Sequence, residues 1–545
     1  MPTITFELND LNKLVGKKLT LKELEDLVDY AKGEVKGGEK GELEVNFDDT
    51  NLPYLWSVEG FARLLKGILG KEKGLAKLNV KKSPEKIIVD KSVSAVRPYV
   101  AAFTARGKEV DDYLIKQLIQ LQEKLCQSYG RKRENVAIGV YSHKKIKFPV
   151  HYKAVAPESI KFVPLEFKRE MSLGEILETH PKGIEFSWIL KGQKKYPILI
   201  DSNKEVLSFP PIINSNYSGK VEAGDKDLFF EATGNDLRAV LLAANIFAYT
   251  FAERGFQISE VETDYGSKKV KCPFSFNEKM KLKLSDVNER LGIKLTDAQV
   301  KKLLEKARFG YKNGVAFIPD YRHDIIHPVD LIEEIAIMYG YNNIPEHPLE
   351  SYTVGETFPI TGFINNTRDI ISGLGYQEIF SPILSNKELL YEKMNIKDFG
   401  TVEIEHYMTE HYSVVRTWVL PMLLDVLSKN KHVEYPQRLF EAGWITKKKD
   451  LKDYKRLAVV TAHNNATFTE VKQVLDVLMR SFGVDYTIEE INHDSFIEGR
   501  VGRVSVKGKE VAFIGEVSPE VLENFGLEVP VAGFELNLSD LFDVL

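Results

Sequence analysis

Residues 319–341 read PDYRHDIIHPVDLIEEIAIMYGY, and this run predicts one helix with a defined start and a defined end. Pro328 suits the first helical turn because proline lacks an N–H and its φ is already near the helical value. Gly340 suits the position just past the helix end, where a left-handed backbone is common. Between them, apolar residues recur at helical spacing and predict a buried stripe: Leu331, Ile332, Ile335 and Met338.

Four carboxylates accompany this helix. Asp330, Glu333 and Glu334 stand at i, i+3 and i+4, so they share one face near the helix start, and Asp324 can fold back over the same end. Carboxylate oxygens are the ligands that Mg²⁺ prefers, which predicts a magnesium site at these residues. The alternative from the spacing alone is that the acidic groups complement the positive end of the helix dipole and face water.

Length and composition describe a globular chain of several domains. With 545 residues the chain is too long for one core, and about three or four domains are expected. A net charge of −5 argues against nucleic-acid binding by bulk charge but leaves room for a local basic patch. Cys126 and Cys272 are the only cysteines, which excludes a disulfide framework. The chain shows no signal-peptide pattern and no membrane-spanning apolar run, so we expect a cytoplasmic location without membrane contact.

The acidic run also resembles a known family. Asp324, Asp330, Glu333 and Glu334, followed by YGYNNIP at 339–345, resemble the magnesium-site motif of the phenylalanyl-tRNA synthetase beta subunit. Further segments agree with this family in chain order: Arg97-Pro98, Gly130-Arg-Lys-Arg133, Phe162-Val-Pro-Leu165, His180-Pro-Lys-Gly183, Ser208-Phe-Pro-Pro-Ile-Ile-Asn214 and Thr233-Gly234. The chain is therefore identified as a member of this family, in its archaeal or eukaryotic form.

The resemblance implies an α+β multidomain fold with four parts. They are an α/β N-terminal domain at 1–80, a central B3/B4-type tRNA editing domain at 85–270, a small helical B5-type domain with the magnesium motif at 272–345, and a domain at 355–545 with a class II synthetase-like antiparallel sheet that lacks catalytic motifs. Polar, pattern-breaking residues at 70–85 independently predict a linker after the first part.

Local patterns predict individual elements. Hydrophobic periodicity indicates helices at 19–30 and 113–125 and strands at 42–47 and 136–141. Ser57 is predicted to cap a helix that begins at Val58, and Ser285 to cap another that ends at Gly292.

The densest basic cluster of the central part is Arg131, Lys132 and Arg133. A solvated loop and a contact with RNA phosphates both suit such a cluster, and the sequence leaves this choice open.

Two strand-like segments of the central part carry polar residues against an apolar background. Residues 206–216 include two prolines and end in small polar residues, and residues 228–236 alternate so that Glu231 and Thr233 point to one face. Placed side by side, the two segments would form a pocket for a small polar molecule, or for hydrolysis of an ester by a positioned water. A plain strand pair with a polar turn is the alternative.

The resemblance implies that this pocket hydrolyses tRNA wrongly charged with tyrosine. It places Glu231, Thr233 and Ser215 at the border of the editing pocket, with Leu207 and Asn214 close by. A phenylalanine site rejects an added hydroxyl only partially, so a second site that recognises the tyrosine hydroxyl is useful. We infer that Glu231 or Asn214 binds the phenol, and that Thr233 or the terminal hydroxyl of the RNA orients the attacking water.

The last part resembles a class II synthetase core without its catalytic residues. Residues 363–382 resemble the first class II motif, and Arg438 and Glu441 distantly resemble the second. Residues 533–537 lack the glycines and the arginine of the third motif, and the glycine-bearing run at 498–503 precedes a predicted strand instead of a helix. We expect this part to dock a partner.

The resulting hypothesis is the beta chain of a phenylalanine–tRNA ligase heterotetramer with two alpha and two beta subunits. The resemblance implies that the alpha subunit binds ATP and charges tRNA(Phe), while this chain supplies editing, RNA contact, assembly surface and a Mg²⁺ site. Two alternatives are a freestanding aminoacyl-tRNA deacylase and a scaffold without chemistry.

Overall fold

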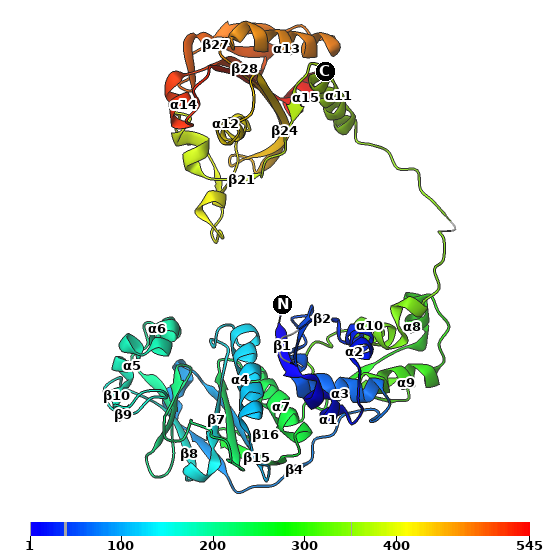
Figure 1. Cartoon of the computed structure of the whole chain (residues 1–545), viewed down its shortest axis with the longest axis vertical. Coiled ribbons are helices and arrows are strands. Elements are labelled where there is room, and N and C mark those ends of the chain that lie inside the picture. Colours follow the sequence, from blue (N-terminus) through cyan, green and yellow to red (C-terminus); the bar gives the residue numbers. More distant parts are fainter. Residues whose placement is uncertain (1, 38–40, 350) are drawn as a thin grey trace. The chain divides into compact units, whose positions relative to one another are not determined.

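The computed structural model describes residues 2–37, 41–349 and 351–545, and the chain forms two compact units, Met1–Pro348 and Leu349–Leu545 (Figure 1). Both units mix helices and strands. The four-part division expected from the sequence is finer than these two units and stays a prediction. No helix among the described residues is both long enough and apolar enough to cross a membrane.

The first unit begins with a small α/β arrangement. Its antiparallel sheet has the order β1-β3-β2, with β1 at Thr3–Glu7, β2 at Gly33–Gly37 and β3 at Glu42–Phe47. Its helices are α1 at Leu8–Val15, α2 at Leu21–Val28 and α3 at Val58–Ile68. The predicted helix at 19–30 and strand at 42–47 are confirmed. Ser57 also caps α3 as predicted, because its Oγ accepts the N–H of Gly60 at 3.1 Å.

A sheet of eleven strands forms the centre of the first unit. Nine strands follow the order β13-β12-β11-β8-β5-β15-β6-β14-β7, and β4 and β16 also pair with β15. Their bounds are β4 Val80–Lys81, β5 Lys86–Val89, β6 Tyr99–Arg106, β7 Val136–Ser142, β8 Val150–Val155, β11 Tyr196–Ile200, β12 Val206–Phe209, β13 Ile213–Asn214, β14 Leu228–Gly234, β15 Gln257–Asp264 and β16 Lys269–Cys272.

The expectation that the two polar segments lie side by side is wrong. β12 pairs with β11 and β13, whereas β14 pairs with β6 and β7. Alternation along a strand shows which residues share a face but not which strand is the neighbour. The segments meet across a cavity instead, as described below.

Two helices cover the large sheet. Figure 1 shows α4 (Asp112–Lys124) and α7 (Leu237–Glu253) between this sheet and the N-terminal helices. α7 is buried on every side from Val240 to Phe251, as expected for a helix that is apolar all round. A smaller subdomain at the other end of the sheet contains β9 Lys161–Phe162, β10 Met171–Ser172, α5 Leu173–Thr179 and α6 Pro181–Phe186.

The first unit ends with the elements around the acidic run. They are β17 Lys279–Lys281, α8 Leu284–Leu291, α9 Asp297–Lys306, β18 Gly310–Lys312, β19 Val315–Phe317 and α10 Pro328–Tyr339. The helix expected from residues 319–341 is confirmed, and Gly340 follows it with a φ of 92°. The expected cap at Ser285 is wrong, because α8 already begins at Leu284 and its N-cap residue is Lys283.

The second unit is built on a seven-stranded sheet with the order β20-β24-β25-β29-β28-β27-β26. All neighbouring strands are antiparallel except β20, which runs parallel to β24. The strands are β20 Gln377–Glu378, β24 Gln437–Lys447, β25 Lys452–Ala462, β26 Thr487–Glu490, β27 Phe496–Val506, β28 Lys509–Val517 and β29 Val531–Asn537; a separate small sheet holds β21 Leu384–Ser385, β22 Val402–Glu403 and β23 Val414–Val415.

Helices cover both faces of the seven-stranded sheet. α11 (Pro359–Gly373), α13 (Phe468–Ser481) and α15 (Leu538–Val544) share one core with the strands. α12 (Leu420–Lys429) and α14 (Pro519–Asn524) share a second core.

The residues that distantly resemble the second class II motif form ion pairs within this unit. Arg438 pairs with Glu470 at 3.1 Å. Glu441 is buried and pairs with Arg416 at 2.8 Å.

Candidate functional site

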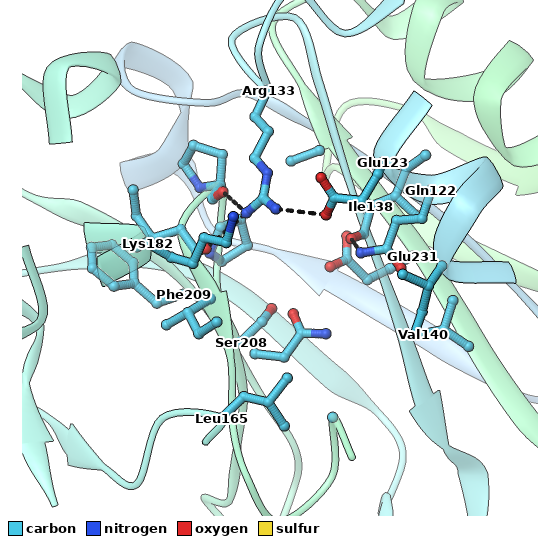
Figure 2. Close-up of a pocket in the computed structure, with 18 of the residues that line it drawn as sticks. Gln122, Glu123, Arg133, Ile138, Val140, Leu165, Lys182, Ser208, Phe209 and Glu231 are labelled. Carbon is cyan, nitrogen blue, oxygen red and sulfur yellow. Dashed lines mark hydrogen bonds and ion pairs between the residues drawn. The ribbon is translucent and has the colours of Figure 1, made fainter. Parts of the chain in front are cut away.

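A cavity of about 450 Å³ lies where the two ends of the large sheet face each other, beside α4 and α6 (Figure 2). One end supplies Glu231 of β14 and residues of β7, and the other end supplies Ser208 of β12 and Asn214 of β13. Much of the wall is apolar, including Leu118, Ile138, Val140, Leu165, Phe209 and Ile212. A cavity of this size with few polar groups is typical of a small-ligand site.

Arg133 connects the two ends of the sheet. Figure 2 shows its guanidinium at the edge of the cavity, where Nη1 donates to the backbone oxygen of Ile212 at 3.0 Å and Nη2 pairs with Glu123 at 3.1 Å. The guanidinium carbon also lies 4.3 Å from the centre of the Phe186 ring. Of the basic cluster at 131–133, two residues are exposed as a solvated loop would be, but Arg133 is buried.

A second buried arginine, Arg97, binds the end of β14. Its Nε donates to Thr233 Oγ1 at 3.0 Å and its Nη2 donates to the backbone oxygen of Thr233 at 2.6 Å. Nη1 donates to the backbone oxygen of Glu134 at 2.8 Å. The expected role of Thr233 in orienting water therefore finds no support in this arrangement, because its hydroxyl is buried against Arg97.

Glu231 is the carboxylate of the cavity. Its side chain is 2% exposed, and its Oε1 lies 2.8 Å from the hydroxyl oxygen of Tyr141. The same hydroxyl lies 3.3 Å from Asn214 Oδ1, so one tyrosine bridges the two ends of the sheet. The other carboxylate oxygen, Oε2, has no hydrogen-bond partner among the described residues.

Burial raises the pKa of Glu231 to about 7, although the hydrogen bond from Tyr141 and the charge of Arg97 act to lower it. Gly139, opposite Glu231 on β7, makes room for this group. A Cβ at that position would lie 2.2 Å from the Tyr141 hydroxyl oxygen and 2.7 Å from Glu231 Oε1.

The structure separates the five residues expected at the editing pocket. Glu231 and Asn214 line the cavity, and Thr233, Ser215 and Leu207 do not. Ser215 is buried and its Oγ lies 3.0 Å from that of Ser218, while Leu207 packs in a core cluster under the sheet. The sequence did not point to the other polar cavity residues, which are Gln122, Glu123, Glu166, Lys182, Ser208 and Lys220, or to Tyr141 beside them. Gly139 within an otherwise apolar strand was the available signal.

The four carboxylates of the acidic run have three separate partners. Arg322, itself buried, donates from Nε to Asp324 Oδ1 at 2.7 Å and from Nη2 to Glu334 Oε1 at 2.7 Å. Asp330 Oδ2 accepts the N–H groups of residues 326 and 327 at 2.8 and 2.7 Å and so caps α10. Glu333 pairs with Lys32 at 2.6 Å.

The four carboxylates do not converge on one point in the described part of the chain. Within the described residues, no group of three or more acidic, histidine or cysteine side chains converges as a metal site requires. Burial raises the pKa of Asp324, but the charge and hydrogen bonds of Arg322 outweigh it, so the pKa lies below its ordinary value. The Arg322 guanidinium thus supplies the positive charge that the prediction assigned to Mg²⁺, and the magnesium site stays a prediction.

Arg322 also contacts a segment that is remote in the sequence and precedes α3. Arg322 Nη1 donates to the Tyr54 hydroxyl at 3.2 Å, and the guanidinium carbon lies 5.0 Å from the Tyr54 ring centre. Both Leu52 and Tyr54 are buried in the core of the first unit.

Comparisons with known proteins first give the class. Residues 280–341 match the family described as the tRNA synthetase B5 domain, and residues 344–538 match the phenylalanyl tRNA synthetase beta chain CLM domain. The chain is therefore a mixed α+β multidomain protein of the tRNA synthetase class.

Relatives that match over the whole length give the particular family. The chain is 42% identical to the phenylalanine–tRNA ligase beta subunit of Pyrococcus horikoshii, over 99% of this chain and 100% of that protein. It is 40% identical to the corresponding subunit of Archaeoglobus fulgidus, over 100% of this chain and 99% of that protein. An N-terminal fragment of the Pyrococcus horikoshii beta subunit, known from a crystal structure, covers 62% of this chain and 100% of the fragment, with a TM-score of 0.60 and 40% identity. The chain belongs to the family of phenylalanine–tRNA ligase beta subunits, in its archaeal form, and the resemblance seen in the sequence is confirmed.

The buried carboxyl of Glu231 leads to a pH-dependent stability. Its pKa in the folded chain, about 7, lies above the ordinary value of 4.5, so its stabilising contribution is complete below pH 4.5 and is lost as the pH rises through 7. Glu231→Gln carries no such charge. Relative to the variant, the wild-type chain should lose about 2–3 kcal/mol of unfolding free energy between about pH 5 and about pH 8. Urea unfolding at both pH values measures this loss.

A matched control uses Glu178, which is exposed on α5. The free energy of unfolding of Glu178→Gln should differ from that of the wild-type chain by the same amount at both pH values. An equally constant difference for Glu231→Gln would show that the Glu231 carboxyl is not desolvated.

The buried ion pairs of Arg322 lead to a second prediction. Arg322→Met leaves Asp324 and Glu334 buried without a counter-charge, and we expect a loss of about 3–5 kcal/mol in unfolding free energy. The control Lys32→Met removes more exposed ion pairs and should cost about 0–1 kcal/mol. A chelator should leave the wild-type melting temperature unchanged. A fall on chelation, together with restoration by Mg²⁺, would instead support the carboxylates as a magnesium site.

Proposed function

We propose that this chain supplies the proofreading activity of phenylalanine–tRNA ligase and hydrolyses tRNA(Phe) wrongly charged with tyrosine in the cavity at Glu231. The observation that carries the proposal is a buried carboxylate oxygen, Glu231 Oε2, without a partner among the described residues and at the edge of a largely apolar cavity. A tyrosine ring fits against the apolar wall, and its phenol donates to this oxygen. Phenylalanine offers no donor and leaves the oxygen buried and unpaired, which costs about 1–3 kcal/mol.

Basic side chains around the cavity suit the RNA part of such a substrate. Lys182 and Lys220 line the cavity. Each also forms an ion pair with an exposed glutamate, Lys182 with Glu185 at 2.9 Å and Lys220 with Glu222 at 3.2 Å. These exposed pairs are weak, so the ammonium groups are available to phosphate oxygens. Arg133 is already bound to protein groups and is assigned a structural role.

The proposed reaction is the hydrolysis of an ester. A water attacks the carbonyl carbon of the tyrosyl ester, the bond to the ribose oxygen breaks, and that oxygen takes a proton as tyrosine leaves. Because Arg97 covers Thr233, we assign the orientation of the water to the terminal ribose hydroxyl of the RNA, and Glu231 to recognition of the phenol.

Charging itself is assigned to a partner. We propose that an alpha subunit binds ATP and phenylalanine, that two alpha and two beta chains assemble in the cytoplasm, and that tRNA(Phe) contacts the assembly. Large apolar side chains of the second unit support a docking role, because Phe380 is 93% exposed and Met408 is 99% exposed.

The editing proposal predicts a selective loss of activity. In the complex with its alpha subunit, Glu231→Gln should hydrolyse tyrosyl-tRNA(Phe) roughly 10–100-fold more slowly, because the amide keeps its oxygen for the Tyr141 hydroxyl and presents an N–H donor to the phenol in place of Oε2. Charging of tRNA(Phe) with phenylalanine should stay unchanged. The assay follows release of labelled tyrosine, with Glu178→Gln as the control. Hydrolysis at the wild-type rate by Glu231→Gln would contradict the proposal. It would show either that editing takes place at another site or that this chain is a scaffold without chemistry.

The docking proposal predicts an assembly defect. Phe380→Ser combined with Met408→Ser should lower the fraction of chain that co-purifies with the alpha subunit. The control Leu451→Ser changes an apolar residue that is 71% exposed on the turn between β24 and β25. Sedimentation velocity measures the assembled fraction. Full-rate proofreading by a chain that never associates would favour a freestanding deacylase.

A further inference from the structure

A second cavity, of about 400 Å³, lies on one face of the seven-stranded sheet of the second unit. Its floor crosses adjacent strands in register, because Arg503 of β27 stands opposite Phe513 of β28, and Phe513 stands opposite Glu535 of β29. Arg456 of β25 lies two residues from Ala458, the partner of Glu535, and so shares the same face. The proposed editing function makes no use of this cavity.

One wall of this second cavity is aromatic. The Trp418 and Phe513 ring centres lie 6.1 Å apart, and those of His493 and Phe513 lie 5.1 Å apart. Phe399, which is 60% exposed, lies 6.4 Å from Trp418 between ring centres. Flat aromatic faces at the border of an open cavity suit the stacking of another planar group.

Basic side chains form another part of the lining of the second cavity. Lys447, Lys448 and Lys449 line the cavity from the hairpin that joins β24 to β25, and Arg456 and Arg503 line it from the sheet. Within the described ranges, the three lysines and Arg456 form no ion pair, while Arg503 lies 3.5 Å from a carboxylate of Glu510. Glu535 is the one acidic residue among those that line the cavity. The balance of charge therefore favours an anion.

Glu535 adds an unsatisfied acceptor on the floor. Its side chain is completely buried, and Oε2 accepts the backbone N–H groups of Val419 and Leu420 at 2.8 Å each. The second oxygen, Oε1, has no hydrogen-bond partner among the described residues, and neither has Arg456 Nε. Burial raises the pKa of this carboxyl. Buried polar atoms without partners are rare, which points to a donor supplied by a ligand.

We propose that this cavity binds one nucleotide, with its base against the Trp418–Phe513 wall and its phosphate on the lysine hairpin at 447–449. Aromatic faces stack bases, and clustered ammonium and guanidinium groups bind phosphate. Glu535 Oε1 accepts a hydrogen bond from an exocyclic amino group of the base, so the site prefers adenine to hypoxanthine, which has a carbonyl at that position. The nucleotide comes either free from solution or as an unstacked residue of an RNA.

The test uses isothermal titration of the isolated full-length chain, because an ATP-using partner would add a second nucleotide site. AMP should bind saturably and about tenfold more tightly than IMP. Lys448→Glu, at an exposed hairpin position, should weaken AMP about tenfold. The control Lys431→Glu, exposed in the same unit and outside the cavity, should leave it unchanged.

Glu535→Gln supplies a second, independent readout. Its amide keeps an oxygen for the two backbone N–H groups and presents a donor in place of Oε1, so the preference should reverse toward IMP. Competition between AMP and a short oligoribonucleotide with a single-stranded adenosine end identifies the source, and the tighter ligand is the occupant. Inorganic phosphate binding as tightly as AMP would overturn the proposal by showing an anion patch only, as would the absence of saturable binding by any of these ligands.

Discussion

Arg133 and Tyr141 join the two ends of a large sheet across the cavity at Glu231, and Arg97 binds the end that carries Glu231. Arg97 and Arg133 donate to several backbone oxygens near the cavity, including those of Glu134, Thr233 and Ile212. Such carbonyls are costly to bury without donors, and a planar guanidinium satisfies several of them at once. The cavity thus exists because the sheet closes on polar bridges instead of packing shut.

This closure also sets the chemistry of Glu231. In the unfolded chain this carboxyl would have its ordinary pKa. In the folded chain it is desolvated, and its pKa rises to about 7. Tyr141 satisfies one oxygen and leaves the other free for a ligand. The proposed recognition of a tyrosine hydroxyl depends on that unpaired oxygen, because a fully satisfied carboxylate would discriminate little between two similar side chains.

The acidic run follows the same principle with a different result. Its carboxylates are compensated from within the chain, by Arg322, by Lys32 and by the backbone at the start of α10. A motif that indicates a divalent cation by residue type and spacing is here compatible with an internal ion pair. The second unit has the opposite charge pattern. Five basic residues line its cavity together with one buried carboxylate, that of Glu535.

Much of the fold was readable in the sequence because the signals are local. The start of α10 at Pro328, the cap of α3 at Ser57 and the strand β3 all follow from residue preferences within a few positions. The family, too, followed from short motifs in chain order. Strand neighbours could not be predicted, since the segments at 206–216 and 228–236 both read as strands and yet β12 and β14 do not pair.

Residue order alone was enough to predict the class of protein, most of the local elements and two of the cavity residues, Glu231 and Asn214. The folded chain alone reveals that Thr233 is buried under Arg97, that Tyr141 joins Glu231 to Asn214, and that Arg322 pairs with Asp324 and Glu334 of the acidic run. The physical reason is distance along the chain. A partner from a remote segment changes the charge, burial and hydrogen bonding of a residue, and no local pattern records that partner.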